Sequence, residues 1–379
     1  MGKNRLPAIG MCVASRFSGC RNKANRIQLF YLDVESQMTR NKYLLAEKIV
    51  VYGAAAAMAA VIYFAFAPLI LPVDPTGPIA PLLTGEFGYE ILLVSVLLAA
   101  GLAFAAGGVL VRPGSFSLVL LAGMAGVSMK SGMFRVVLWQ KGTDLGIWVC
   151  MLAELLILAA AMLIVDFAAS LFRRRAIRRG GFTALSARLS DEQLASLAED
   201  KLILPERQML WSRDVLPNMA VENHFLSLLL LLCGLNRFKS SHRTLAVMAL
   251  KNAAGFTVVG MAVGLVAAYV LAGSVARGQL VFAAFGAFWL AAEAGYYLYP
   301  VPDSFPAWLL PVMVGAAYYV IAMFTSSDLN PDQWTKLKNV FQILPVDWIF
   351  AGGAGAMFSL WSSDRSKEVR IIEKLDIQE

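Results

Sequence analysis

Charged residues are scarce in this chain. Asp, Glu, Lys and Arg make up 16% of its 379 residues, whereas a soluble domain has about 25%. Hydrophobic residues make up 58%, the mean hydropathy is +0.63, and the apolar residues lie in long runs. These features exclude an ordinary soluble domain and predict an all-α protein that crosses a membrane several times.

Histidine is nearly absent, and the common catalytic motifs are missing. The two histidines, His224 and His242, lie in one polar stretch, which excludes bis-histidine haem ligation inside a helix bundle and an HExxH zinc site. The sequence also lacks a P-loop, a dinucleotide-binding fingerprint and a GxSxG nucleophile elbow. We therefore predict that the protein is not an enzyme and has no catalytic residue, cofactor or metal.

Cysteine is also sparse, with four residues and no CxxC or other metal-ligand spacing. Cys12, Cys20 and Cys233 fall in segments that we assign to the cytoplasm, where thiols stay reduced, so we expect no disulfide. The net charge of +7 would suggest nucleic acid in a soluble protein. Basic residues also collect in the cytoplasmic segments of membrane proteins, and we predict no specific nucleic-acid partner.

Apolar runs long enough to cross a bilayer recur along the chain, because a spanning helix needs about 20 mostly apolar residues. We predict eight spans in two blocks of four, joined by a polar region. The spans are 49–71, 91–111, 116–138, 147–171, 251–272, 279–299, 307–325 and 343–362. The chain then divides into a basic tail (1–48), block 1 (49–172), a cytoplasmic region (173–250), block 2 (251–362) and a charged tail (363–379). For the first tail we favour a disordered segment, or a true start at Met38, over a targeting signal.

Basic residues set the expected orientation, since Lys and Arg favour the cytoplasmic side. Arg40, Lys42 and Lys48 precede the first span, and the run FRRRAIRR follows the fourth. Both termini and region 173–250 are therefore predicted to be cytoplasmic, in a bacterial inner membrane. The loop 326–342 is predicted outside although it contains Lys336 and Lys338. The basic residues therefore define the orientation of the second block less strongly than that of the first.

Aromatic residues near the predicted span ends fit an interfacial belt. We place these residues at the membrane boundary: Trp139, Trp148, Tyr296, Tyr297, Tyr299, Trp308 and Trp361.

The cytoplasmic region 173–250 has the size of a small helical module. Ser190 and Gln193 have capping-box spacing. One interpretation is a docking surface for protein partners, and the other, which we favour, is a solvated linker held near anionic lipid headgroups by its arginines. The residues expected to make these contacts are Arg173, Arg174, Arg175, Arg178, Arg179, Arg207 and Arg213.

Lys130 and Glu154 are the most informative charges, because a charge near the bilayer centre costs at least about 2.5–3.5 kcal/mol. Lys130 lies nine residues from Trp139, and Glu154 lies seven residues beyond Ile147, so both are about 10–13 Å deep. An antiparallel hairpin would place them level. A structural ion pair is the first interpretation, and an ion, proton or substrate site or a lysine that extends to the interface are the others.

Glu293 is the second candidate for an intramembrane polar site. No basic residue of the neighbouring spans is level with it, and we weigh a functional and a structural role equally. Asp347 follows Pro345 and is expected to cap the start of the last span. The GxxxG motif of Gly260 and Gly264 is expected to serve packing within the molecule.

Two functional hypotheses follow. The first is a non-catalytic subunit of a multiprotein membrane assembly, such as a secretion or conjugation apparatus, with region 173–250 as its docking module. The second is a transporter or channel that uses Lys130, Glu154 and Glu293, with helices interrupted at Pro311 and at the glycines of residues 352–355.

Overall fold

The described part of the chain consists of helices joined by short turns. The computed structural model describes residues 49–64, 96, 115–130, 138, 145–178, 240–301, 305–326 and 337–363, and it contains no strand among them. For residues 115–116, 130, 166–178, 240–246 and 326 only the backbone is described. Residues 51–379 form one compact unit and residues 1–50 another.

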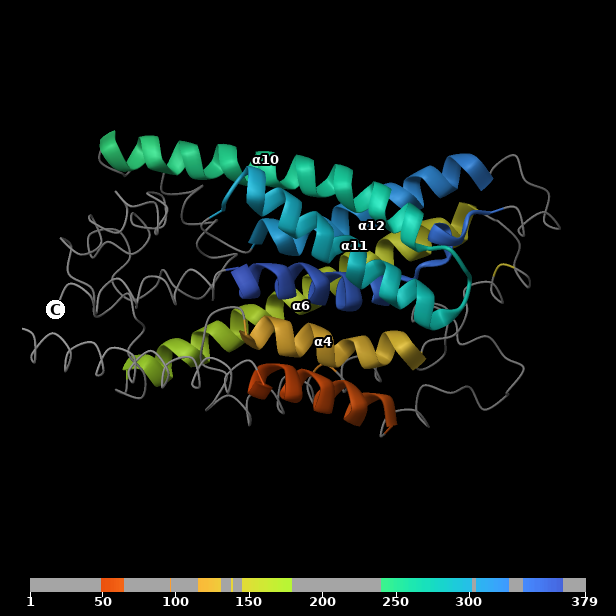
Figure 1. Ribbon diagram of the computed structural model, residues 1–379, viewed down its shortest axis with the longest axis horizontal. Helices are drawn as coiled ribbons and strands as arrows, with labels where there is room; N and C mark the ends of the chain where they lie inside the picture. The colour runs from red at the N-terminus through yellow and green to blue at the C-terminus, as the bar shows by residue number, and fades with distance from the viewer. Residues whose placement is uncertain are drawn as a thin grey trace, which may run out of the picture. The chain divides into compact units, whose positions relative to one another are not determined.

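The helices are shown in Figure 1. The first runs over Ile49–Phe64. The labelled helices are α4 (Ser115–Lys130), α6 (Leu145–Arg178), α10 (Ser240–Leu271), α11 (Arg277–Leu298) and α12 (Phe305–Ser326). A short 3-10 helix, η5 (Asn339–Gln342), precedes the π-helical turn η6 (Asp347–Gly352). The chain continues from η6 as an α-helix to residue 363, and we call residues 345–363 the central helix.

Four helices are long and apolar enough to cross a membrane. They are Leu145–Val165, Val247–Leu271, Arg277–Leu298 and Phe305–Thr325, and they correspond to the predicted spans 147–171, 251–272, 279–299 and 307–325. Large apolar side chains on them face outward, including Val258, Phe282 and Phe324, which are 61–74% exposed. Such surfaces need a hydrocarbon solvent, so these helices indicate a membrane protein.

The other four predicted spans are not established by the described residues. The helices Ile49–Phe64 and Ser117–Met129 are shorter apolar helices, and the rest of spans 49–71 and 116–138, apart from Leu138, lies outside the description. Of span 91–111 only Val96 is described, and span 343–362 contains the π turn.

Two helices are longer than their predicted spans. α10 begins at Ser240, eleven residues before the predicted start at 251, and α6 runs to Arg178 instead of ending near 171. No proline or glycine interrupts residues 240–251, while Gly180 and Gly181 follow the end of α6. Residues 173–178 and 240–250 therefore belong to the long helices α6 and α10.

α10 packs on α11 and α12 through one buried face that contains three small residues. Phe256, Gly260, Gly264 and Ala268 recur every four residues on its buried face, a ridge spacing that lets helices approach closely. A Cβ atom added at Gly260 would lie 2.8 Å from both Cδ atoms of Leu310. The GxxxG motif thus serves packing within the molecule, as predicted.

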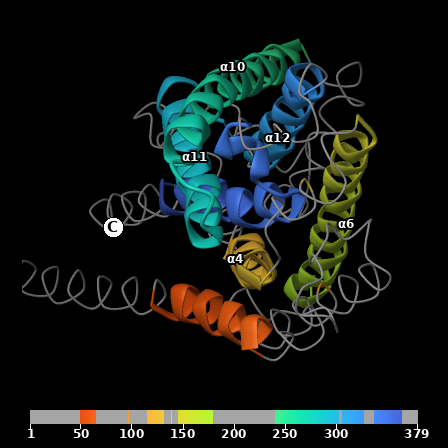
Figure 2. The same cartoon turned by 90° about the vertical axis from the view of Figure 1, so that its right-hand side faces the viewer.

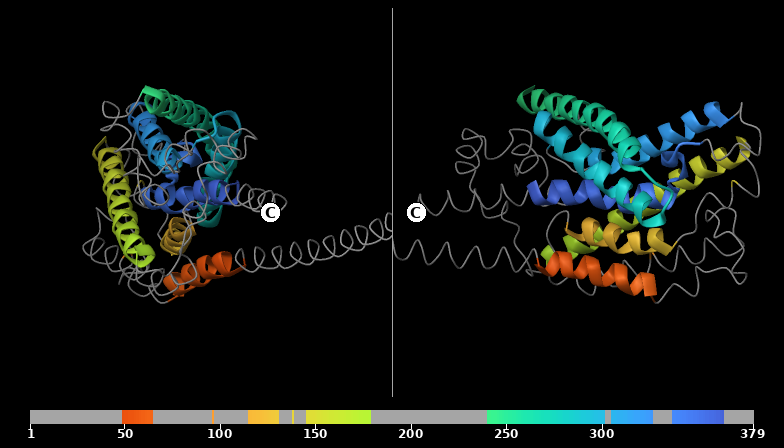
Figure 3. Two further views of the ribbon diagram at one scale, coloured as in Figure 1. Left: turned by 90° about the vertical axis from the view of Figure 1, so that its left-hand side faces the viewer. Right: turned by 45° about the vertical axis from the view of Figure 1, so that its right-hand side comes forward.

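The central helix lies among α4, α6, α11 and α12, as Figure 2 shows. Nearly all of its side chains are buried. A Cβ atom added at Gly355 would overlap the main-chain carbonyl of Phe285 in α11, so only glycine permits this approach. The helix Ile49–Phe64 runs beside α4 (Figure 3), where a Cβ atom at Gly126 would lie 2.6 Å from the Ala59 carbonyl oxygen.

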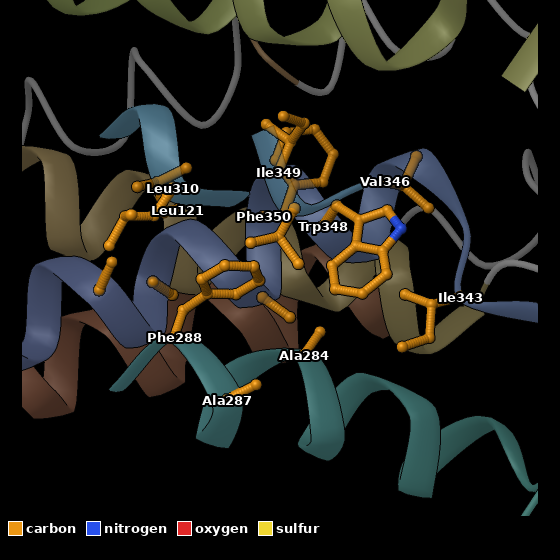
Figure 4. Packing of buried hydrophobic residues seen from close by; sticks show 14 of the residues in the cluster. Leu121, Ala284, Ala287, Phe288, Leu310, Ile343, Val346, Trp348, Ile349 and Phe350 are labelled. Carbon is orange, nitrogen blue, oxygen red and sulfur yellow. The ribbon is translucent and has the colours of Figure 1, made fainter. Parts of the chain in front are cut away.

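Aromatic rings pack around Trp348 at the start of the central helix (Figure 4). The Trp348 ring stacks on Tyr318 with centroids 5.7 Å apart and meets Phe288 edge to face at 5.8 Å. Of the aromatic residues predicted to lie at the membrane boundary, four have side chains buried inside the bundle: Trp148, Tyr296, Trp308 and Trp361. Tyr297 and Tyr299 are exposed as expected, and Trp139 lies outside the described residues.

Candidate functional site

A buried ion pair joins the start of α11 to the start of the central helix. Nη1 of Arg277 donates to Oδ2 of Asp347 at 2.7 Å, and Nη2 donates to Oδ1. The Asp347 side chain is fully buried and that of Arg277 is 11% exposed. A two-pronged contact between a guanidinium and a carboxylate is the strongest kind of charge-assisted pair. The pair therefore fixes the relative rotation and height of these two elements.

Two further hydrogen bonds hold residues 343–347, which we call the helix-start turn, and a third joins Arg277 to α4. Nε of Arg277 donates to the Ser128 carbonyl oxygen in α4 at 2.8 Å, and the Ser128 hydroxyl donates to the Val346 carbonyl oxygen at 3.0 Å. The Tyr319 hydroxyl, from α12, donates to the Ile343 carbonyl oxygen at 2.8 Å. Side chains of α4, α11 and α12 thus meet at one turn of the central helix.

Asp347 also caps the central helix, as expected from the sequence. The Leu344 amide donates to Oδ2 of Asp347 at 2.9 Å. Pro345 occupies the first helical position, where its missing N–H is no loss, and Asp347 accepts from the amide three residues before it. One carboxylate therefore satisfies a helix end and neutralises a guanidinium.

Glu154 lies near this cluster. It belongs to α6 and is 2% exposed. The Tyr319 hydroxyl is within electrostatic range of Glu154, Asp347 and Arg277. Glu154 is therefore part of a polar group, contributed by several helices, near one end of the bundle.

Lys130, the predicted partner of Glu154, is described only as backbone. α4 extends to Lys130, two residues beyond Ser128, but the Lys130 side chain lies outside the description. α4 packs chiefly on the central helix, and α6 packs chiefly on α12. The ion pair between Lys130 and Glu154 therefore stays a prediction, and a simple two-helix hairpin does not describe how these helices pack.

Glu293 occupies a separate place on α11. Its Oε2 atom accepts hydrogen bonds from the hydroxyls of Ser359 at 2.6 Å and Ser363 at 3.5 Å, both on the central helix. Glu293 lies sixteen residues after Arg277 on the same helix, which is about 24 Å by helical rise. The structure thus does not bring Glu293 to the cluster that contains Glu154.

The arginines assigned to docking or lipid contact are outside what the structure describes in atomic detail. Arg173, Arg174, Arg175 and Arg178 lie in the last turns of α6, where only the backbone is described. Arg179, Arg207 and Arg213 lie in the undescribed stretch 179–239. The predicted docking and lipid contacts remain predictions.

Arg277 is the residue that sequence reasoning missed. It is the first residue of α11, directly after the turn 272–276, and Asp347 lies near the start of the last predicted span, so the predicted topology puts both at the outer side. Comparing depths around Asp347, as was done for Lys130 and Glu154, would have identified the pair. Ser128 gave no such signal, because its contacts involve main-chain atoms.

Comparison of the chain with protein-family models, with curated proteins and with solved structures finds no match. Within the described residues, no three His, Cys, Asp or Glu side chains gather where they could hold a metal ion.

Proposed function

We propose that this protein is a non-catalytic integral membrane subunit of a multiprotein assembly, such as a secretion or conjugation apparatus. In this proposal the chain crosses a bacterial inner membrane eight times in two blocks, with both termini in the cytoplasm. The four candidate spans and their apolar outer faces support the membrane location. Residues 179–239, between α6 and α10, would carry the surface that meets cytoplasmic partners.

The observation that carries this proposal is the use of the buried charge. The nearly buried Arg277 donates to the buried Asp347 and to the Ser128 carbonyl oxygen, and the exposed Glu293 accepts from Ser359. Each of these contacts joins two helices, and for Arg277 and Asp347 the charges are paired within the bundle. Charged side chains that contact neighbouring helices hold the bundle together, as expected for a rigid membrane scaffold.

Partner capture tests the proposal. The full chain is solubilised in mild detergent after brief cross-linking in the membrane, and co-purifying proteins are quantified. We expect a fixed set of partners at constant ratio, reduced at least severalfold in R207A/R213A. The matched control E206Q/D214N removes two negative charges from the same stretch, instead of two positive ones, and should retain the partners. Recovery of the chain as a lone monomer, with no partner at constant ratio, would contradict the proposal.

A transporter or channel is the second candidate, and a specific observation favours it. The central helix is interrupted by the η6 turn next to a buried group of ionisable residues, and α12 contains Pro311. Broken helices beside buried polar groups are typical of transporter binding sites. The separation of Glu154 from Glu293 speaks against one shared cavity for both.

Cysteine accessibility tests the transport hypothesis. A cysteine at position 154 should react with a small water-soluble thiol reagent from one side of the membrane if Glu154 faces a water-filled path. The exposed Cys150, one turn before it, provides an internal reference for α6. Resistance of position 154 to reagents added from both sides would end this hypothesis while leaving the scaffold proposal untouched.

A further inference from the structure

The start of the central helix contains a rare element. Residues Asp347–Gly352 form a π-helical turn, whereas the chain from 353 to 363 is α-helical. At the junction, the Gly353 amide donates to the carbonyl oxygens of both Ile349 and Phe350. π turns inside α-helices are uncommon and concentrate at functional sites. The turn therefore needs a physical reason to persist.

The π turn decides where Asp347 points. Each residue of an α-helix advances by about 100° around the axis, and a π turn accommodates one extra residue. The residues that precede it are therefore rotated by about 100° relative to a continuous α-helix. In the observed rotation Asp347 reaches Arg277, and the Val346 carbonyl reaches the Ser128 hydroxyl.

The two ends of this turn are held very differently. On the C-terminal side, Gly355 is wedged against the Phe285 main chain, and Gly353 lies close to the Leu121 side chain. These contacts are steric and leave little freedom. On the N-terminal side the helix-start turn is held by polar contacts from α4, α11 and α12. A change of register would thus move the N-terminal part and leave the C-terminal part in place.

We propose that residues 347–352 are a two-state element, kept in the π form by the Arg277–Asp347 ion pair. When the pair is broken, the turn relaxes to a regular α-helix. Asp347 then rotates away from α11, and the Val346 carbonyl leaves Ser128. The end of α4 and the start of α11 then lose their shared contact with the central helix and stay joined only by the Arg277–Ser128 hydrogen bond. The device couples three helices at one end of the bundle, and it goes beyond either proposed function.

Amide hydrogen exchange of the full chain in lipid nanodiscs tests this device. The variant D347N keeps an oxygen that can accept from the Leu344 amide but loses the charge that holds Arg277. We expect exchange at least tenfold faster in residues 344–352 and 124–130, with unchanged exchange in residues 354–362. R277Q should give the same pattern, because it removes the other partner. The control S363A, at the far end of the central helix, loses only a long exposed contact and should leave both segments at wild-type rates.

Two results would overturn the proposal. Wild-type exchange in residues 344–352 of D347N would mean that the ion pair does not hold the π turn. A uniform increase over α10, α11 and α12 would mean that the pair only adds general stability. If D347N and R277Q fail to fold, R277K carries the same test under the same criteria. It keeps the positive charge but cannot form the two-pronged contact or the Nε bond to Ser128.

Discussion

Two hydroxyl groups of the central helix contact the exposed carboxylate of Glu293. The Ser359 hydroxyl donates to Glu293 at 2.6 Å from a position that is 1% exposed. The Ser363 hydroxyl makes a longer contact of 3.5 Å with the same oxygen. Two serines one helical turn apart therefore differ in distance and burial, and they form a natural pair of variants.

We predict that S359A lowers the free energy of unfolding by about 0.5–1.5 kcal/mol, the usual net contribution of a hydrogen bond, because its carboxylate partner Glu293 is exposed to solvent. The matched variant S363A should lower it by less than about 0.5 kcal/mol, since it loses a weak contact. Reversible unfolding of both variants in detergent checks this. Equal losses in the two would show that the 2.6 Å contact has no special weight.

Charge exchange tests the remaining prediction for Lys130. Glu154 is 2% exposed, so placing a like charge opposite it, or reversing it, should destabilise the fold by several kcal/mol. We predict that K130E and E154K each lower the midpoint of thermal unfolding and that K130E/E154K restores most of the loss.

The control for this exchange is K130E/E293K, because Glu293 lies about 24 Å along α11 from the polar cluster. That double variant should show no rescue. A K130E/E154K protein no more stable than the worse single variant would remove the ion pair from consideration.

At the level of helices, close approach is made possible by individual glycines. A Cβ atom at Gly355 would overlap the Phe285 carbonyl, whereas nothing lies within 4 Å of the position at Gly53. Both glycines occur within helices, where alanine is intrinsically favoured by about 1 kcal/mol. The same substitution should therefore have opposite signs at the two positions.

We predict that G355A destabilises the protein by more than about 2 kcal/mol, because main-chain atoms cannot move aside as a flexible side chain can. G53A should be neutral or stabilise by up to about 1 kcal/mol. Thermal unfolding of the two variants under one detergent condition checks the difference. A stabilised G355A would show that α11 and the central helix do not pack as closely as described.

Long apolar helices were the part of the fold that could be predicted from local sequence. Spans 147–171, 251–272, 279–299 and 307–325 follow from length and apolar composition alone, and each has a helix in the structure. The π turn could not be predicted, since it depends on contacts with Arg277 and Ser128, which lie 70 and 218 residues away from their partners. The length of a span depends on local sequence, whereas the rotation of the helix at the π turn depends on contacts with residues of other helices.

In the polar cluster too, the individual charges could be predicted from local sequence, but the residues around them could not. Glu154 and Asp347 stood out because charges in apolar segments are costly. Their surroundings include side chains of three other helices, α4, α11 and α12, whereas the comparison of depths within one hairpin considered only Lys130. Burial of Trp148 and Trp308 was also missed, because an aromatic residue near a span end can face lipid headgroups or the bundle interior with the same local sequence.

For the whole molecule, the ion pair bears on the orientation of the second block. Lys338 lies in the loop 326–342, which is predicted outside despite its lysines. Arg277 and Asp347 are in contact, so Ser274 and the segment that begins at Leu337 belong to the same end of the molecule. Tyr297 lies twenty residues beyond Arg277 on α11, about 30 Å away, which is the thickness of a hydrocarbon core.

We therefore predict that S274C and K338C react from the same side of the membrane and Y297C from the other, in a chain whose four native cysteines are serine. All three positions are exposed, and Tyr297 is 86% exposed, so side-chain burial does not limit the reaction. A membrane-impermeant thiol reagent applied to intact cells should modify S274C and K338C, whereas Y297C should need permeabilised cells. The opposite assignment would invert the block and place Lys336 and Lys338 in the cytoplasm, as their charge alone favours. A side difference between S274C and K338C would be incompatible with the Arg277–Asp347 contact itself, so the labelling tests the packing together with the topology.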